Sequence, residues 1–209
     1  MDLDLSLGEF EALAAKALRG TGYSWGAATD GAHAALVLAQ NGLPAAEIAL
    51  RLVTNVEDHG PGTSVLQDPS SGRATAPICA VTYGAALSDL AGAAPDLVAS
   101  VAKSRPVIEP LLLAPFLTNC IIGWADGSVC VTHRGIELNG SMPVGAVHIT
   151  IDFDGDAGTG LEDGCAVRNH KGSTRAVVAP ATYRSLQAFA ARTYAPASKQ
   201  SRSSGAGAD

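Results

Sequence analysis

Apolar residues recur at helical spacing through the first quarter of the chain. Ser6 followed by Glu9 is a capping-box pattern, and the apolar positions behind it predict a helix that ends at Gly20. An alanine-rich helix follows, and Pro44 suits the first turn of a third helix. The pattern predicts a compact helical cap over residues 6–53.

The apolar pattern then changes to short runs and alternation, which are typical of strands. Asp126-Gly127 and Asn139-Gly140 are residue pairs that favour two-residue hairpin turns. Apolar and polar residues alternate from Val147 to Phe153, which predicts a half-buried strand with His148 and Asp152 on its polar face. The predicted strands lie near residues 78–83, 119–125, 128–134, 146–153 and 175–179.

These elements predict an α+β fold in a single domain, residues 1–195. Its parts are the helical cap, a sheet-rich part over residues 78–179 with mainly antiparallel hairpins, and a C-terminal helix over residues 180–194 that Pro180 opens. Weak helical spacing also runs over residues 85–103. A tail rich in Ser, Gly and Ala, residues 196–209, is expected to be disordered.

Composition and charge restrict the class of protein. Hydrophobic residues make up 47% of the 209 residues, which is ample for a core. The net charge of −6 argues against a nucleic-acid partner, because a phosphate-binding surface needs clustered Lys and Arg. The most lipophilic run, residues 107–117, is broken by Glu109 and two prolines and is too short to span a bilayer, so no membrane partner is expected.

The N-terminus and the cysteines indicate a cytoplasmic protein. Met1 to Asp4 is acidic where a signal peptide would be basic, and no apolar segment follows it. The four cysteines lack the close paired spacing of zinc ligands, so we expect neither a disulfide framework nor a structural zinc site.

The first hairpin suggests a candidate catalytic pair. With a two-residue loop at Asp126-Gly127, Cys120 lies directly opposite His133 on one face of the ribbon. An imidazolium there would stabilise a thiolate, so Cys120 and His133 are the candidate catalytic residues. A longer loop would shift the register, and two core residues could occupy the same positions.

Candidate ligand-binding residues lie in a long loop and on the alternating strand. Residues 54–77 contain three glycines and three prolines, which predicts a long loop, and long loops in compact domains are often lids or binding loops. Within it, His59, Thr63 and Ser64 offer an imidazole and two hydroxyls. His148 and Asp152 complete the candidate ligand-binding set.

We expect no metal and no cofactor. The three carboxylates of residues 152–156 are spaced as in a calcium loop, but Gly155 comes one place early and Asp163 stands where a bidentate Glu is required. His33 lies among alanines of the second helix and is expected to be a packed or half-exposed residue.

Two functions are consistent with these features. The first is a non-catalytic module in metabolism that binds a small molecule or a partner, with homo-oligomer formation expected from its apolar surface. The alternative is a small cytoplasmic enzyme that acts on a polar metabolite through Cys120 and His133. The sequence offers no third residue to orient the imidazole, which favours the module.

A resemblance to known families is carried by Lys16-Ala17-Leu18-Arg19-Gly20-Thr21-Gly22-Tyr23-Ser24-Trp25-Gly26 with Ala28 behind it. This stretch resembles the opening of an uncharacterised family of bacterial proteins of about 200 residues, a domain of unknown function. Residues 9–53 are also distantly similar to the N-terminal helices of type-2 malate/lactate dehydrogenases, where a Ser-His-Gly catalytic turn follows. Here the equivalent stretch is Leu43 to Glu47 and lacks that turn. The resemblance therefore implies a helical scaffold and says almost nothing about function.

Overall fold

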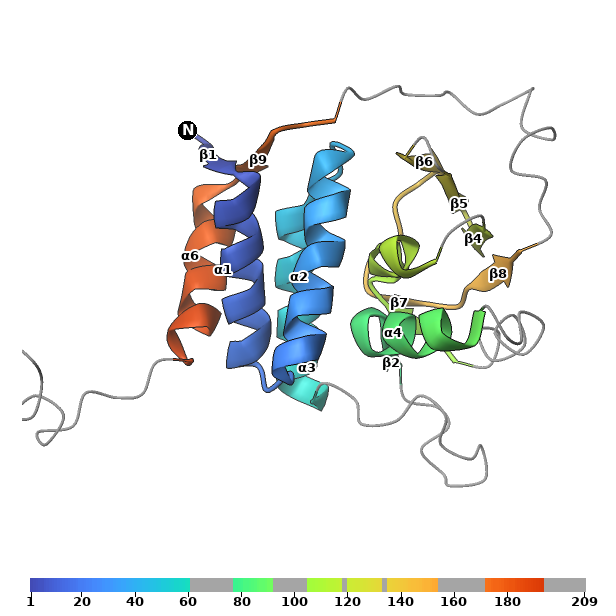
Figure 1. Cartoon of the computed structure of the whole chain (residues 1–209), viewed down its shortest axis with the longest axis horizontal. Helices are drawn as coiled ribbons and strands as arrows, with labels where there is room; N and C mark the ends of the chain where they lie inside the picture. Colours follow the sequence, from blue (N-terminus) through green and yellow to red (C-terminus); the bar gives the residue numbers. More distant parts are fainter. Residues whose placement is uncertain (61–76, 92–104, 118–119, 133–134, 154–171, 194–209) are drawn as a thin grey trace, which may run out of the picture.

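The computed structural model describes residues 1–60, 77–91, 105–117, 120–132, 135–153 and 172–193, and it has the predicted α+β architecture. Helices α1 (Leu7–Gly20) and α6 (Pro180–Ala191) form one outer layer. The next layer, α2 (Trp25–Gln40) and α3 (Ala45–His59), lies between them and the main sheet (Figure 1). The opposite side carries α4 (Ala80–Ala91), the 3-10 helix η2 (Pro110–Phe116) and the main sheet. No described helix is both long enough and apolar enough to cross a membrane.

The predicted helices are confirmed, including the capping box of α1. Ser6 accepts a hydrogen bond from the Glu9 backbone N–H at 3.2 Å, and Glu9 accepts one from the Ser6 backbone N–H at 2.8 Å. Helix α3 is longer than predicted and includes residues 54–59, which we expected to be loop. The reason is Val56, which is buried and extends the apolar face of Leu52 by one turn.

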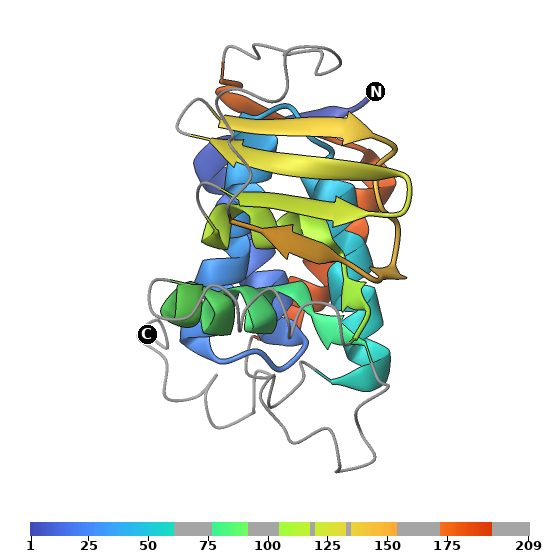
Figure 2. The ribbon, with the colours of Figure 1, turned by 90° about the vertical axis from the view of Figure 1, so that its right-hand side faces the viewer.

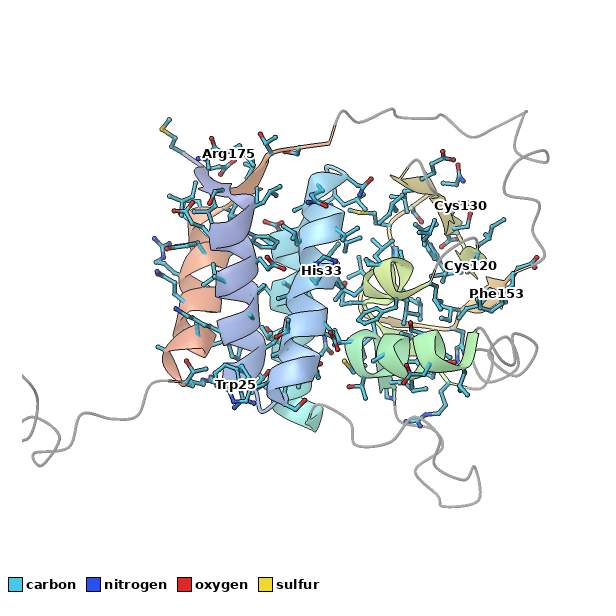
Figure 3. All side chains as sticks on the ribbon, in the orientation of Figure 1. Trp25, His33, Cys120, Cys130, Phe153 and Arg175 are labelled. Carbon is cyan, nitrogen blue, oxygen red and sulfur yellow. The ribbon has the colours of Figure 1, made fainter. Side chains whose placement is uncertain are left out.

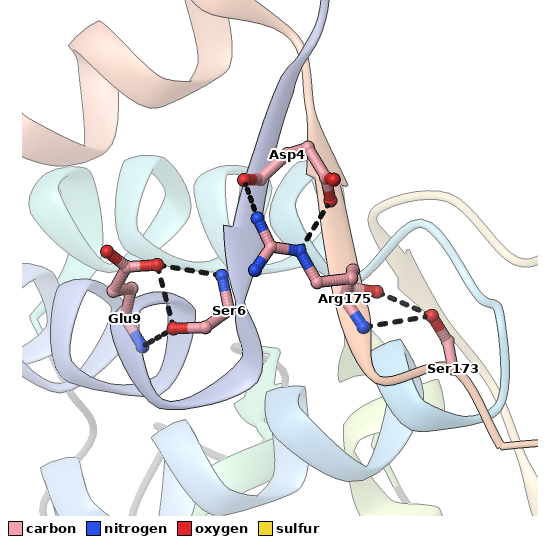
Figure 4. Close-up of polar contacts among 5 residues, drawn as sticks. All are labelled: Asp4, Ser6, Glu9, Ser173 and Arg175. Atoms are coloured by element: carbon pink, nitrogen blue, oxygen red, sulfur yellow. Dashed lines mark hydrogen bonds and ion pairs between the residues drawn. The ribbon is translucent and has the colours of Figure 1, made fainter.

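A two-stranded ribbon joins the two ends of the described chain. The sequence predicted strand β9 (Arg175–Val178) but not its antiparallel partner β1 (Leu3–Ser6). On the outer face, Arg175 donates a 3.0 Å hydrogen bond to the Asp4 carboxylate and a second to the Asp4 carbonyl oxygen (Figure 4). Ser173 Oγ accepts a hydrogen bond from the Arg175 backbone N–H at the start of β9. The ribbon thereby fixes α6 beside α1.

The main sheet is four-stranded and antiparallel, in the order β6-β5-β4-β8. Figure 2 shows one face of it toward the viewer and the helices behind the other face. The strands are β4 (Cys120–Trp124), β5 (Gly127–Thr132), β6 (Gly135–Gly140) and β8 (Thr150–Asp152). The inner face packs against η2, and both surfaces are apolar. Their buried residues include Cys120, Ile122, Val129, Ile151 and the η2 residues Leu111, Leu112 and Leu113.

The turn assignments within this sheet correct the prediction. The first loop is Ala125-Asp126, because Trp124 pairs with Gly127. A Cβ at Gly127 would lie 2.5 Å from the Asn139 carbonyl oxygen, so this glycine allows β6 to approach rather than forming the turn. Asn139-Gly140 is not a hairpin turn either, since Gly140 is the strand residue opposite Gly127. Strand β5 ends at Thr132 and pairs there with Gly135 of β6, and residues 133–134 lie outside the described residues.

A smaller sheet connects the helical layers to the main sheet. Residues 78–83 were predicted as a strand, but only β2 (Ile78–Cys79) is extended and α4 begins at the next residue. Tyr83 and Leu87 then share the buried face of α4, one turn apart. Strand β2 pairs in parallel with β3 (Val107–Ile108), and β3 pairs antiparallel with β7 (Ala146–Val147).

The remaining predicted elements are confirmed only where the structure describes them. The single strand predicted over residues 146–153 is two strands, β7 and β8, interrupted at residues 148–149. The weak helix predicted over residues 85–103 is present up to Ala91. Leu186 and Ala190 are buried on the inward face of α6, and Tyr183 is half-buried. Residues 92–104 and the tail predicted over residues 196–209 lie outside the described part of the chain.

Candidate functional site

Cys120 lies in the core and not at a surface. It is fully buried in β4, on the face of the sheet that packs against η2. Burial, with a smaller contribution from the neighbouring Cys130 thiol, raises the pKa of Cys120 to about 12. The thiol is therefore protonated near neutral pH, whereas a nucleophilic cysteine needs a thiolate.

The register that brought Cys120 opposite His133 is wrong. Cys120 pairs directly with Val131, because the two-residue loop begins one residue earlier in the chain than predicted. This displacement moves the pairing by two residues, so the described side chains of β4 and β5 keep the faces that alternation predicts and only their cross-strand partners change. His133 itself lies outside the described residues. Among described residues, no imidazole is positioned beside the Cys120 sulfur by this pairing.

The predicted binding loop contributes little to a described site. His59 is the last residue of α3, and its side chain lies outside the described part of the structure. Thr63 and Ser64 belong to residues 61–76, which are also outside it. Residues 154–156 of the acidic turn are outside it as well. His33 is exposed on α2, and its Nδ1 lies 3.6 Å from a carboxylate oxygen of Glu11.

The alternating segment is the predicted feature that reaches a hollow in the surface. Ile149 and Ile151 are buried while His148, Thr150 and Asp152 are exposed, as the polar-apolar alternation predicted. A hollow of about 410 Å³ lies where β4 ends beside β8. Its lining includes Gly123, Trp124, His148 and Thr150 but not Asp152. The structure thus brings one of the predicted binding residues, His148, to a concave site.

Two residues shape this hollow. Gly123 pairs with Ser128 on one side and Thr150 on the other, and a Cβ at Gly123 would lie 2.9 Å from the Thr150 hydroxyl. The missing side chain therefore keeps the space beside Thr150 open. Trp124 is held in place by a 3.0 Å hydrogen bond from its indole N–H to the Ser141 carbonyl oxygen.

An ion pair with a buried carboxylate fixes the segment that leads into the hollow. Glu109 is buried, and both of its carboxylate oxygens accept 2.8 Å hydrogen bonds from Arg51. One of these oxygens also accepts the Gly145 backbone N–H at 3.1 Å, and the Glu109 N–H donates to the Gly145 carbonyl oxygen. Because Gly145 immediately precedes β7, Glu109 holds the strand that carries the chain to His148.

Glu109 was missed as a structural residue by the sequence reasoning. It has a φ of 54°, the only positive φ among the described non-glycine residues. Hydrogen bonding to Glu109 is also the main reason that the pKa of Arg51 is raised. Glu109 could have been found because it is the single acidic residue in the apolar run of residues 107–117. A buried charge without a partner is costly, so its position indicates a paired carboxylate.

The described residues contain no group of three or more His, Cys, Asp or Glu side chains that could hold a metal ion. The hollow offers an imidazole, a hydroxyl and an aromatic wall, with no carboxylate in its lining. Such a surface can form hydrogen bonds and apolar contacts with a small molecule, and it lacks a paired acid and base. Figure 3 shows Cys120 on the sheet side of the molecule, far from His33 on α2.

Comparison with known proteins gives a family match over part of the chain. Residues 5–83 match a family described as "Protein of unknown function (DUF3726)". This stretch begins within β1, covers α1, α2, α3 and β2, and ends within α4. No curated protein and no solved structure shows significant similarity to the chain. The match therefore links the helical part of the fold to a family of unknown function.

Proposed function

We propose that this protein is a non-catalytic module that binds a small polar molecule in the hollow between β4 and β8. The observation that carries the proposal is the meeting of an exposed imidazole, His148, and a hydroxyl, Thr150, at a concave surface with an indole wall. Ligand sites commonly combine apolar walls with a few polar groups that fix the orientation of the ligand.

The ligand expected from this lining carries a hydrogen-bonding group beside a flat or apolar part. His148 and Thr150 can each donate or accept a hydrogen bond. Trp124 supplies apolar area while its N–H stays bonded to Ser141. The Arg51–Glu109 pair holds the preceding strand, so the site is largely formed before the ligand arrives, which lowers the ordering cost of binding.

The alternative, an enzyme that uses Cys120 as its nucleophile, is less well supported. A buried thiol with a raised pKa would need both exposure and a large downward shift of its pKa before it could attack a substrate. His133 could serve such a reaction only through an arrangement other than direct pairing with Cys120.

The binding proposal is tested by NMR with a defined probe set. A panel of small carboxylic acids, amino acids and nucleosides is added to ¹⁵N-labelled protein, each at about 1 mM, which detects even weak binding. We expect at least one compound to shift the amide signals of Gly123, His148 and Thr150. Saturating shifts elsewhere, or no shifts from the whole panel, would overturn the proposal.

Three variants locate the site. His148→Ala and Thr150→Val each remove one hydrogen-bonding group, and Gly123→Ala adds a methyl group 2.9 Å from the Thr150 hydroxyl. Each is expected to weaken binding about tenfold, which corresponds to one lost hydrogen bond or one blocked contact. Gly26→Ala is the matched control, because a Cβ at Gly26 meets open space on α2. Unchanged affinity in all three site variants would contradict the proposal.

Alkylation separates the binding module from the enzyme. Iodoacetamide reacts with thiolates, so the folded protein is expected to leave Cys120 unmodified at pH 7. Peptide mass spectrometry after the reaction reports each cysteine separately. Rapid modification of Cys120 with a midpoint near neutral pH would favour the enzyme alternative instead.

A further inference from the structure

The outer layer of helices contains a groove on the side of the molecule away from the main sheet. It is lined by α1 and α6, which Figure 1 shows side by side. Its volume is about 560 Å³. Its apolar lining includes Ala12 and Leu13 from α1 and Tyr183 and Ala190 from α6. Glu9 and Lys16 lie at the two ends of its α1 side. An apolar groove with one charge of each sign at its ends is a candidate contact surface.

The groove-lining positions of α1 are spaced symmetrically along the helix, with opposite charges at the two ends. Glu9 and Lys16 lie equally far from a point midway between Ala12 and Leu13. All four residues belong to one stripe of the helix, because they are spaced by three and four residues. If a second α1 lies antiparallel with a two-fold axis at that midpoint, Glu9 faces Lys16 of the other copy and Ala12 faces Leu13 of the other copy.

We propose that this groove is the contact surface of a two-fold symmetric homodimer, with antiparallel α1 helices at its centre. The pair formed by Glu9 of one copy and Lys16 of the other occurs twice in such a dimer, as the symmetry of an isologous interface requires. The small Ala12 opposite the larger Leu13 lets the two helices approach closely. The occupant that the groove fits is therefore a second copy of this chain.

Helix α6 completes the contact. When α1 of one copy lies in the groove, it also packs against Tyr183 and Ala190 of the other copy, so four helices form the dimer core.

The capping box uses only the Oε2 atom of Glu9, so pairing through Oε1 would leave that box intact. Helices of 14 and 12 residues are about 21 and 18 Å long, which limits the buried area. A micromolar dissociation constant is expected for an interface of this size.

Sedimentation velocity across about 1 to 100 μM protein tests the dimer. The unmodified protein is expected to change from monomer to dimer within this range, and added salt should weaken the dimer because the charge pairs are exposed. Lys16→Glu places a second carboxylate against Glu9 of the other copy and is expected to raise the dissociation constant at least tenfold. Lys16→Gln should have a smaller effect in the same direction.

A mixing experiment tests the symmetry itself. Glu9→Lys alone is also expected to be mainly monomeric, because its new ammonium group would face Lys16 of the other copy. When the Lys16→Glu and Glu9→Lys variants are mixed, every heterodimer sets two carboxylates on one copy against two ammonium groups on the other. The mixture should therefore form heterodimers with nearly the original affinity. Glu9→Lys also removes the capping box, so circular dichroism must first show that this variant is folded.

Ala12→Arg blocks the centre of the contact and does not depend on charge pairing at its ends. Ala12 is exposed, so the substitution should leave the monomer fold intact and abolish the dimer over the same concentration range. Ala188→Arg is the matched control, an exposed alanine of α6 that does not line the groove. A monomer at all concentrations, or a dimer that Lys16→Glu and Ala12→Arg both leave unchanged, would overturn the proposal.

Discussion

Arg51 and Glu109 form a two-pronged ion pair across the middle of the molecule, with Nε and one terminal nitrogen of Arg51 each 2.8 Å from a different carboxylate oxygen. Arg51 belongs to α3, and Glu109 follows β3 and precedes η2. The Glu109 side chain is 1% exposed and that of Arg51 is 32% exposed. The pair therefore joins the helical layers to the sheet through a partly desolvated contact.

Removing one partner of this pair should cost more stability than removing both. Arg51→Ala leaves the buried Glu109 carboxylate without its cation and is expected to lower the free energy of unfolding by about 3 kcal/mol. Glu109→Gln should cost less, because its amide oxygen can still accept the Gly145 N–H. Urea unfolding of both single variants and of the double variant should show coupling of more than about 1 kcal/mol.

The backbone conformation of Glu109 provides a separate test. Because a Cβ is disfavoured at a φ of 54°, the Glu109→Gly variant is expected to be about 1 kcal/mol more stable than the Glu109→Ala variant. Both substitutions remove the ion pair equally, so the difference between them isolates the backbone. Equal stability of Glu109→Gly and Glu109→Ala would contradict this reasoning.

Burial of Cys120 should make the fold sensitive to alkaline pH. Its folded pKa of about 12 lies above the usual thiol value of 9.0, so the unfolded chain loses this proton first. The contribution of this thiol to the free energy of unfolding is therefore complete below about pH 9. It falls as pH rises toward 12, by at most about 1.4 kcal/mol per pH unit. Cys120→Ala should show a smaller slope between pH 9 and 10 in urea unfolding. An unchanged slope would argue that this thiol is accessible in the folded state.

Gly140 and Gly145 form a matched pair for testing the close approach of β5 and β6. Their φ angles are 75° and 73°, but a Cβ at Gly140 would lie 2.2 Å from the Asp126 carbonyl oxygen, whereas a Cβ at Gly145 meets nothing within 4 Å. Gly145→Ala should cost about 1 kcal/mol through its backbone conformation alone. Gly140→Ala should cost at least about 1 kcal/mol more, because backbone atoms must also move. Thermal and urea unfolding report both values.

The capping box predicts an acid-dependent contribution at the start of α1. Hydrogen bonds from the Ser6 hydroxyl and the Ser6 N–H lower the pKa of Glu9. The Glu9 carboxylate therefore stabilises the fold at pH values above 4.5, the usual pKa of this group. This contribution is lost as the pH falls through the lowered pKa of the folded state. Ser6→Ala should cost about 1 kcal/mol at pH 7 through loss of the cap. The cost should shrink at low pH, where unfolding measurements on both proteins can be compared.

The helices could be predicted because their signals are local. Ser6 and Glu9 identify the start of α1 within four residues, and the buried face of α3 follows from residues one turn apart. The hairpin register could not be obtained in the same way. Gly127 has the chemistry of a turn residue, but the backbone of β6 needs it free of a side chain, and β6 is reached only through later residues.

The candidate site, like the fold, was predictable only where the signal is local in the sequence. The exposure of His148 and Asp152 followed from alternation, because side chains of a strand point to opposite faces in turn. That only His148 reaches the hollow depends on where β4 ends beside β8. Glu109 was missed because its partner Arg51 lies 58 residues away, and no local pattern indicates which charge will meet it.

The pairing of β1 with β9 and of α1 with α6 has a consequence for synthesis on the ribosome. The helical layers begin with residues 3–20 and are completed only by residues 175–191, so the chain must close across most of its length. A Cβ at Gly20 would lie 1.9 Å from the Phe189 carbonyl oxygen, so α6 approaches α1 too closely for this contact to tolerate a larger residue. Until α6 emerges, the nascent chain must expose the faces of α1 and α3 that α6 later covers. Emergence of α6, rather than completion of the sheet, is thus the last step that the architecture requires before the helical layers can close.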